Sequence, residues 1–174
     1  MNKLFQTFEQ ALEKRNPALL KLLEPGLPES EIRERLHKVH VQGTSDPIIS
    51  LYSWKNGTRP TRNHTLEELS PFPKSSFCFE DLELMSSHFQ GFREFAKNNS
   101  DFALAAERCF PVFWDSSTRW IAVDTGPKTH FRVVLFDSES LPTIQELYSS
   151  FNAFLKDAIK ANEENRILTC FEVV

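Results

Sequence analysis

The chain has 174 residues, of which 40% are hydrophobic and 25% are charged, and its net charge is −4. This balance is typical of one globular domain, residues 1–174, and excludes a disordered chain. A mildly acidic surface repels phosphate backbones, so we expect no nucleic-acid partner, whereas a basic partner protein is compatible with the charge.

The sequence offers no signal for secretion or for membrane insertion. Gln6 and Glu9 interrupt the first residues, where a signal peptide needs an unbroken apolar core. No apolar run approaches the roughly 18 residues that a membrane span requires. Three widely separated cysteines are typical of reduced thiols, namely Cys78, Cys109 and Cys170. We therefore expect a cytoplasmic protein with no membrane partner.

Helical spacing of apolar residues dominates the first part of the chain. It predicts helices near residues 5–12, 18–23, 29–39 and 48–54, and a longer helix over 82–96. Asn16-Pro17 starts the second of these helices, and Asn56-Gly57 should form a left-handed cap at the end of the fourth. Residues 58–63 are expected to form an exposed loop.

The hydrophobic period changes from that of helices to that of strands after residue 108. Strands are predicted at 109–114, 120–123 and 131–136, and the short turns between them indicate an antiparallel meander. Ser149-Ser150 should cap a final helix, and the β-prone tail 167–174 suggests an added edge strand. The expected fold class is α+β, with N-terminal helices and one C-terminal helix packed on a sheet that is either antiparallel or mixed.

Glycine and phenylalanine depart from average usage in opposite directions. There are only five glycines, and neither G-x-G-x-x-G nor a phosphate-binding loop occurs, so no cofactor is expected. The sixteen phenylalanines predict an aromatic core, with the alternative that some rings form an interface.

Few residues suggest catalysis or metal binding. No G-x-S-x-G motif occurs, and Cys109 lies in an apolar run, where a thiol is usually inert. His37 and His40 could pair on a metal, but no further ligand repeats their spacing, so solvent-facing histidines are expected, and likewise at His88. The aspartates at strand ends, which are Asp115, Asp124 and Asp137, could run acid–base chemistry but more simply form turns.

Candidate partner-binding residues are the exposed charges and the tryptophans. Trp114 ends a strand and could border a groove, next to exposed arginines of the loop 58–63. Glutamate pairs could steer a basic partner by complementary charge. The residues predicted to contact a partner are Trp54, Arg59, Arg62, Glu67, Glu68, Trp114 and Asp115.

Four stretches of the chain, in this order, resemble the SUKH superfamily, which includes the cell-wall assembly regulator family. They are residues 23–32 (LEPGLPESEI), 51–57 (LYSWKNG), 110–113 with 120–124 (FPVF and WIAVD), and 149–155 (SSFNAFL). The resemblance implies a compact α+β binding module without a shared catalytic constellation. Many bacterial members are similar to immunity proteins that bind and neutralise toxins.

The sequence therefore predicts a non-catalytic protein-binding module, and the resemblance implies an immunity protein that neutralises a cognate toxin. Two alternatives stay open. One is a regulatory scaffold with several partners. The other is a small-molecule-binding enzyme, which a deep pocket with convergent polar groups would favour.

Overall fold

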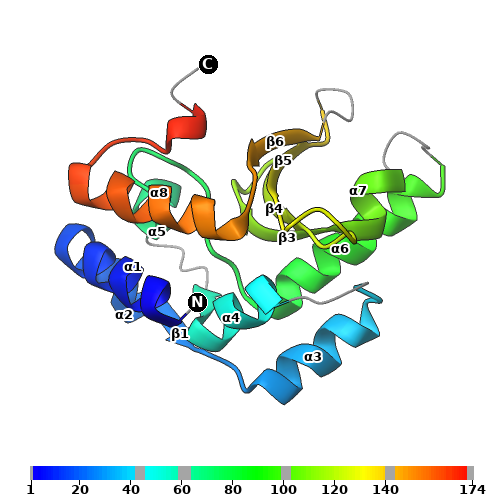
Figure 1. Ribbon diagram of the computed structural model, residues 1–174, viewed down its shortest axis with the longest axis horizontal. Helices are drawn as coiled ribbons and strands as arrows, with labels where there is room; N and C mark the ends of the chain where they lie inside the picture. The colour runs from blue at the N-terminus through cyan, green and yellow to red at the C-terminus, as the bar shows by residue number, and fades with distance from the viewer. Residues whose placement is uncertain (1, 42–45, 59–63, 99–102, 140–143, 172–174) are drawn as a thin grey trace.

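A computed structural model describes residues 2–41, 46–58, 64–98, 103–139 and 144–171. Helices and antiparallel strands form one α+β domain, as predicted (Figure 1). The N-terminal helices are α1 (Asn2–Arg15), α2 (Pro17–Leu22), α3 (Glu29–Lys38), α4 (Asp46–Trp54) and α5 (Leu66–Leu69). They are followed by α6 (Leu82–Ala96) and α7 (Ala103–Arg108), and α8 (Phe151–Glu164) comes after the sheet.

The larger sheet has four strands in the order β3-β4-β5-β6, and every pair is antiparallel. These strands are β3 (Cys109–Trp114), β4 (Arg119–Asp124), β5 (Val133–Asp137) and β6 (Gln145–Tyr148). The predicted meander is confirmed for the first three strands, while β6 was not predicted. A separate two-stranded sheet pairs β1 (Leu23–Pro25) with β2 (Lys55–Thr58).

Helices cover both faces of the four-stranded sheet. On one face, Phe92 of α6 contacts Trp120 and Phe136, with ring centroids 4.8 Å apart in each pair. On the other face, Phe113 contacts Phe154 of α8 at 5.7 Å. Figure 1 shows α8 beside α1 and α6 below the sheet. The aromatic core predicted from the phenylalanine content is therefore confirmed.

Two local predictions are wrong. Gly57 has the expected positive φ of +78°, but it lies in β2 and caps no helix, since α4 already ends at Trp54. A Cβ atom at Gly57 would lie 2.3 Å from the backbone carbon of Glu80, so close approach of two backbones requires the glycine. The tail forms no strand over its described part; Thr169–Phe171 is a 3-10 turn, and residues 172–174 lie outside the described ranges.

Candidate binding groove

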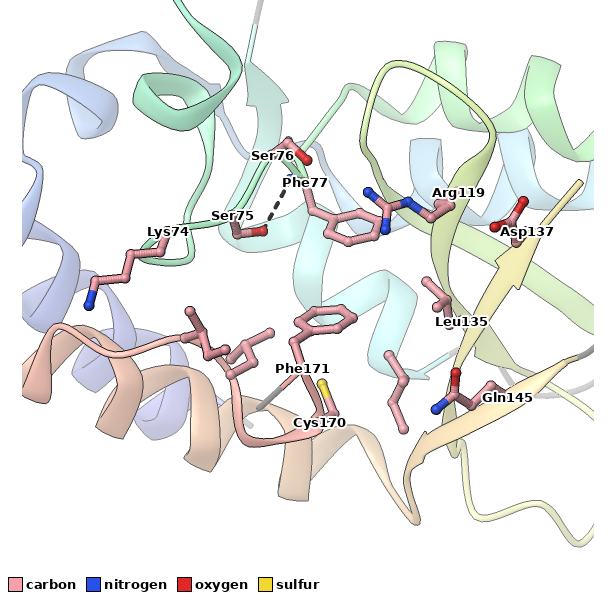
Figure 2. A pocket seen from close by; sticks show the side chains of 13 residues that line it. Lys74, Ser75, Ser76, Phe77, Arg119, Leu135, Asp137, Gln145, Cys170 and Phe171 are labelled. Carbon is pink, nitrogen blue, oxygen red and sulfur yellow. Dashed lines mark hydrogen bonds between the residues drawn. The ribbon is translucent and has the colours of Figure 1, made fainter. Parts of the chain in front are cut away.

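A groove of about 430 Å³ opens where α8 stops covering its face of the sheet (Figure 2). Its floor comes from β4, β5 and β6, one wall from residues 74–77, and the other wall from residues 167–171. We call this surface the sheet groove. Its lining residues are Lys74, Ser75, Ser76, Phe77, Arg119, Leu135, Asp137, Gln145, Leu147, Ile167, Leu168, Cys170 and Phe171.

Strand alternation places the floor residues on the face that α8 covers elsewhere. Ile121 is the register partner of both Phe113 and Leu135, and Phe113 packs against α8. Side chains two residues apart share a face, so Arg119 and Asp137 point the same way as Ile121 and Leu135. Arg119 and Asp137 lie two residues further along β4 and β5 than Ile121 and Leu135, beyond the part of the face that α8 contacts.

The first wall is fixed to the edge of the sheet. Cys78 pairs with Trp114 of β3 through two backbone hydrogen bonds of 2.8 and 3.0 Å. Just before it, the Ser75 hydroxyl accepts a bond from the Phe77 amide at 3.2 Å, which Figure 2 shows. The backbone is thus held on both sides of Phe77, whose ring forms part of the groove.

The second wall is fixed to α8 through one carboxylate, Asp157. Its oxygens accept bonds from the Tyr148 hydroxyl at 2.6 Å and the Arg166 guanidinium at 2.6 Å. They also accept 2.8 Å bonds from the amide and the hydroxyl of Thr169. Partial burial alone would raise the pKa of Asp157, but these hydrogen bonds outweigh it and lower the pKa to about 2.

Arg119 is the cation of the groove floor, and a buried carboxylate holds it. Its Nε donates to Asp115 at 2.7 Å, and the Asp115 side chain is 2% exposed. Desolvation would raise the pKa of Asp115, yet hydrogen bonds from Arg119 and Ser117 lower it, so the acid is charged. The guanidinium carbon lies 5.6 Å from the Phe77 ring centroid, a cation–π contact.

Phe77 and Phe171 join the two walls. Their rings are stacked with centroids 5.5 Å apart and planes 8° apart. Figure 2 shows the two rings facing each other, with Arg119 beside Phe77. The sheet groove therefore combines an aromatic pair with an anchored arginine.

Two ionisable groups near the groove, Cys170 and Tyr148, have raised pKa values. Burial raises the pKa of the Cys170 thiol, which reduces the thiolate fraction at neutral pH. Burial, together with the hydrogen bond to Asp157, also raises the pKa of Tyr148. Across the described ranges, no group of three or more His, Cys, Asp or Glu side chains is placed to hold a metal ion.

Two residues predicted to bind a partner lie at or beside the groove. Asp115 contributes indirectly, because its buried carboxylate positions Arg119 and also accepts the Ser117 amide at 3.0 Å, as a turn aspartate does. Glu67 is exposed on α5 and lines a hollow that shares Lys74, Ser75 and Ser76 with the groove.

The other predicted residues lie elsewhere. Trp114 is half-buried, and its ring packs 4.6 Å from His88, so His88 is not the solvent-facing histidine that was predicted. The Trp54 ring stacks on Phe5 and donates to Glu9 at 3.0 Å. The side chain of Glu68 is engaged in the capping box of α5. Arg59 and Arg62 lie outside the described residues.

Sequence reasoning missed the residues that build the groove, which are Phe77, Arg119, Asp157 and Phe171. Phe77 lies outside every predicted helix and strand, Phe171 lies in the tail that was predicted to be an edge strand, and 94 positions separate the two residues. Arg119 follows the turn at Asp115, and the i,i+4 spacing of this pair is the only local signal. The other contacts that build the groove join residues that are far apart in the sequence, so no local pattern predicts them.

Comparison with models of known protein families and with curated protein sequences finds no match to this chain. The resemblance to the SUKH superfamily therefore stays a prediction. Of the helices in the described part of the chain, none has the length and apolar character needed to cross a membrane.

Proposed function

We propose that this protein is a non-catalytic protein-binding module and that the sheet groove contacts its partner. The observation that carries the proposal is the anchored Arg119 beside the Phe77–Phe171 stack, in a groove between two fixed walls. Aromatic residues and arginine are enriched at protein interfaces, and arginine is frequent among the residues that dominate binding energy.

The fixed geometry of the groove supports tight binding. Association costs conformational entropy for every side chain that must be ordered. Here Asp115 already holds Arg119, and Asp157 already holds the turn that carries Phe171. Few side chains of the groove therefore need to be ordered when the partner binds. Less of the free energy gained from the contacts is lost to conformational entropy, and the affinity is higher.

The proposed biological role is neutralisation of a cognate toxin, as the SUKH resemblance implies. The net charge of −4 supports a partner with a basic surface, since opposite charges accelerate encounter. Glu67 and Glu68 are exposed on α5, and Glu67 lies beside the groove. A regulatory scaffold would use the same surface and would differ in having several partners.

A second candidate is a small-molecule enzyme, and one observation favours it. The groove volume of about 430 Å³ lies within the range of ligand pockets, and Arg119, Asp137 and Gln145 supply polar groups to it. Against it stands the chemistry of the groove, because burial raises the pKa of its thiol, Cys170.

Replacing the exposed Gln145 of β6 by tryptophan is expected to weaken partner binding by about tenfold or more, because a large uncharged ring would fill the groove without adding a charge to it. The measurement has two steps. The tagged full chain first captures its partner from an extract of its native cells, and the captured partner is then titrated against each variant to obtain the dissociation constants. Gln10→Trp on α1 is the matched control, since Gln10 is also exposed and lies outside the groove.

Equal capture by the wild type and Gln10→Trp, with loss in Gln145→Trp, would support the proposal. Capture that is the same in all three proteins would exclude the groove as the contact surface. Turnover of a small molecule by the purified chain, abolished by Gln145→Trp while the fold is retained, would favour the enzyme instead.

A further inference from the structure

Resting on the proposed function, we infer that the sheet groove receives one carboxylate of an extended partner segment, bound by the free end of Arg119 beside an apolar residue of that segment. The inference concerns the chemistry of the partner, which the proposed function leaves open. It depends on the geometry of Arg119, on the charge opposite Arg119, and on the apolar lining.

Arg119 is held at its inner end and open at its outer end. Its Nε donates to Asp115 at 2.7 Å, and its side chain is 46% exposed, against 2% for Asp115. In the part of the chain that the structure describes, neither Nη atom donates a hydrogen bond. A guanidinium has five N–H donors in a planar fork, so the two Nη atoms can bind a carboxylate side by side.

The surroundings of Arg119 would strengthen such a contact. Phe77 lies at 5.6 Å from the guanidinium carbon and limits the orientation of the fork. Leu135 and Leu147 line the floor next to it, and Phe171 lines the far wall. Phe77 is already buried, whereas Leu135, Leu147 and Phe171 are half-buried, so an apolar side chain of the partner would cover these three and exclude water, which strengthens the ion pair.

Asp137 restricts what the groove accepts. It is the direct register partner of Arg119 across β4 and β5, and its Oδ1 accepts the Glu139 amide at 2.9 Å. A second negative charge on the ligand would be repelled there, so a dianionic phosphate fits less well than a single carboxylate. A neutral or basic residue next to the acid fits best, which agrees with a partner of basic overall charge.

The test uses twelve-residue peptides displayed on phage and selected against the full chain. Peptides from this selection are expected to carry one Asp or Glu, or a free C-terminus, next to a Leu, Ile or Phe. Changing that Asp to Asn, that Glu to Gln, or the C-terminus to an amide should weaken binding by about tenfold or more in fluorescence anisotropy. The protein is unchanged in this arm, so folding cannot confuse the result.

The matching protein variant is Arg119→Lys, which keeps the charge and removes the fork, and it should weaken the same peptides by about tenfold. Arg33→Lys on α3 is the control, because Arg33 is exposed and pairs only with Glu29 among the described residues.

Two outcomes would overturn this inference and leave the proposed function standing. One is that selected peptides bind in the groove although they contain neither Asp nor Glu and their C-terminus is blocked. The other is that phosphopeptides bind more tightly than the same peptides with a carboxylate in place of the phosphate. If the groove-blocking Gln145→Trp also leaves every selected peptide and the captured partner bound, the proposed function fails as well.

Discussion

Asp157→Asn is expected to lower the free energy of unfolding by about 2 kcal/mol at neutral pH and to loosen the turn that carries Phe171. The carboxylate accepts four hydrogen bonds, from Tyr148, Arg166 and twice from Thr169. An amide keeps the shape of the side chain but removes its charge and replaces one acceptor by a donor. Urea unfolding of the two proteins measures the difference.

The same prediction has a defined pH window. The pKa of Asp157 is about 2 when folded, below its ordinary value of 3.8, so the unfolded chain binds the proton more tightly. The stabilisation is present above pH 4 and is lost as the pH falls through 2. Each unit of pKa difference is worth about 1.4 kcal/mol, which gives the size of the effect.

Glu163→Gln is the control for Asp157→Asn. Glu163 is an exposed carboxylate on the same helix, and no ion pair or hydrogen bond is found for it within the described ranges. The control should unfold like the wild type. Two results would show that Asp157 does not hold the second wall. One is that Asp157→Asn is as stable as the wild type at neutral pH. The other is that the wild type and Asp157→Asn lose stability in parallel between pH 4 and 2.

Glu80→Gln is expected to stabilise the protein by about 3 kcal/mol at pH 8 and to have little effect below pH 4.5. Glu80 is 4% exposed, and its Oε2 has no hydrogen-bond partner among the described residues. Burial, with the charge of Asp81 as the smaller cause, raises the pKa of Glu80 to about 7 from an ordinary 4.5. Charging this carboxyl therefore costs free energy in the folded state.

The direction with pH follows from proton binding. Between pH 4.5 and 7 the folded protein binds the Glu80 proton more tightly than the unfolded chain, so stability falls as the pH rises through this range. A glutamine keeps the shape of the neutral acid and has no such dependence. Urea midpoints of the wild type and Glu80→Gln should therefore coincide below pH 4.5, diverge as the pH rises from 4.5 to 7, and stay apart above pH 7.

Glu13→Gln on α1 supplies the comparison for Glu80, because Glu13 is exposed to solvent. It should follow the wild type at every pH. A Glu80→Gln protein that is less stable than the wild type throughout would show that Glu80 has a charged partner in the folded state.

Local pattern predicted most of the helices and the strands of the meander. Phe151, Phe154, Leu155 and Ala158 repeat at helical spacing, and all four are buried in α8, with the Ser150 hydroxyl accepting the Ala153 amide at 3.2 Å. Where periodicity and a cap agree in this way, a single sequence is enough to place a helix.

Strand β6 and the C-terminal turn escaped prediction because tertiary contacts decide them. Gln145–Tyr148 has no strong strand pattern and is extended because β5 pairs with it. Thr169–Phe171 is rich in β-prone residues, yet the Thr169 amide is taken by Asp157, twelve positions earlier. Strand propensity predicts little at a residue whose backbone amide donates to a partly buried carboxylate instead of to a neighbouring strand.

The candidate site was predicted only in part. Asp115 and Glu67 were identified as polar residues at a turn and in an acidic pair, and the structure gives them a place at or near the groove. Arg119 was not identified, because its significance depends on Phe77, which is 42 positions earlier in the chain. A contact between positions so far apart produces no periodic pattern in the sequence from which it could be predicted.

The most direct test of the binding account is amide hydrogen exchange of the full chain, alone and with its captured partner. Binding in the sheet groove should add protection at residues 75–77, in β6 and at residues 168–171, which surround the groove. Unchanged exchange in these three segments, with protection confined to α3 or α6, would contradict it.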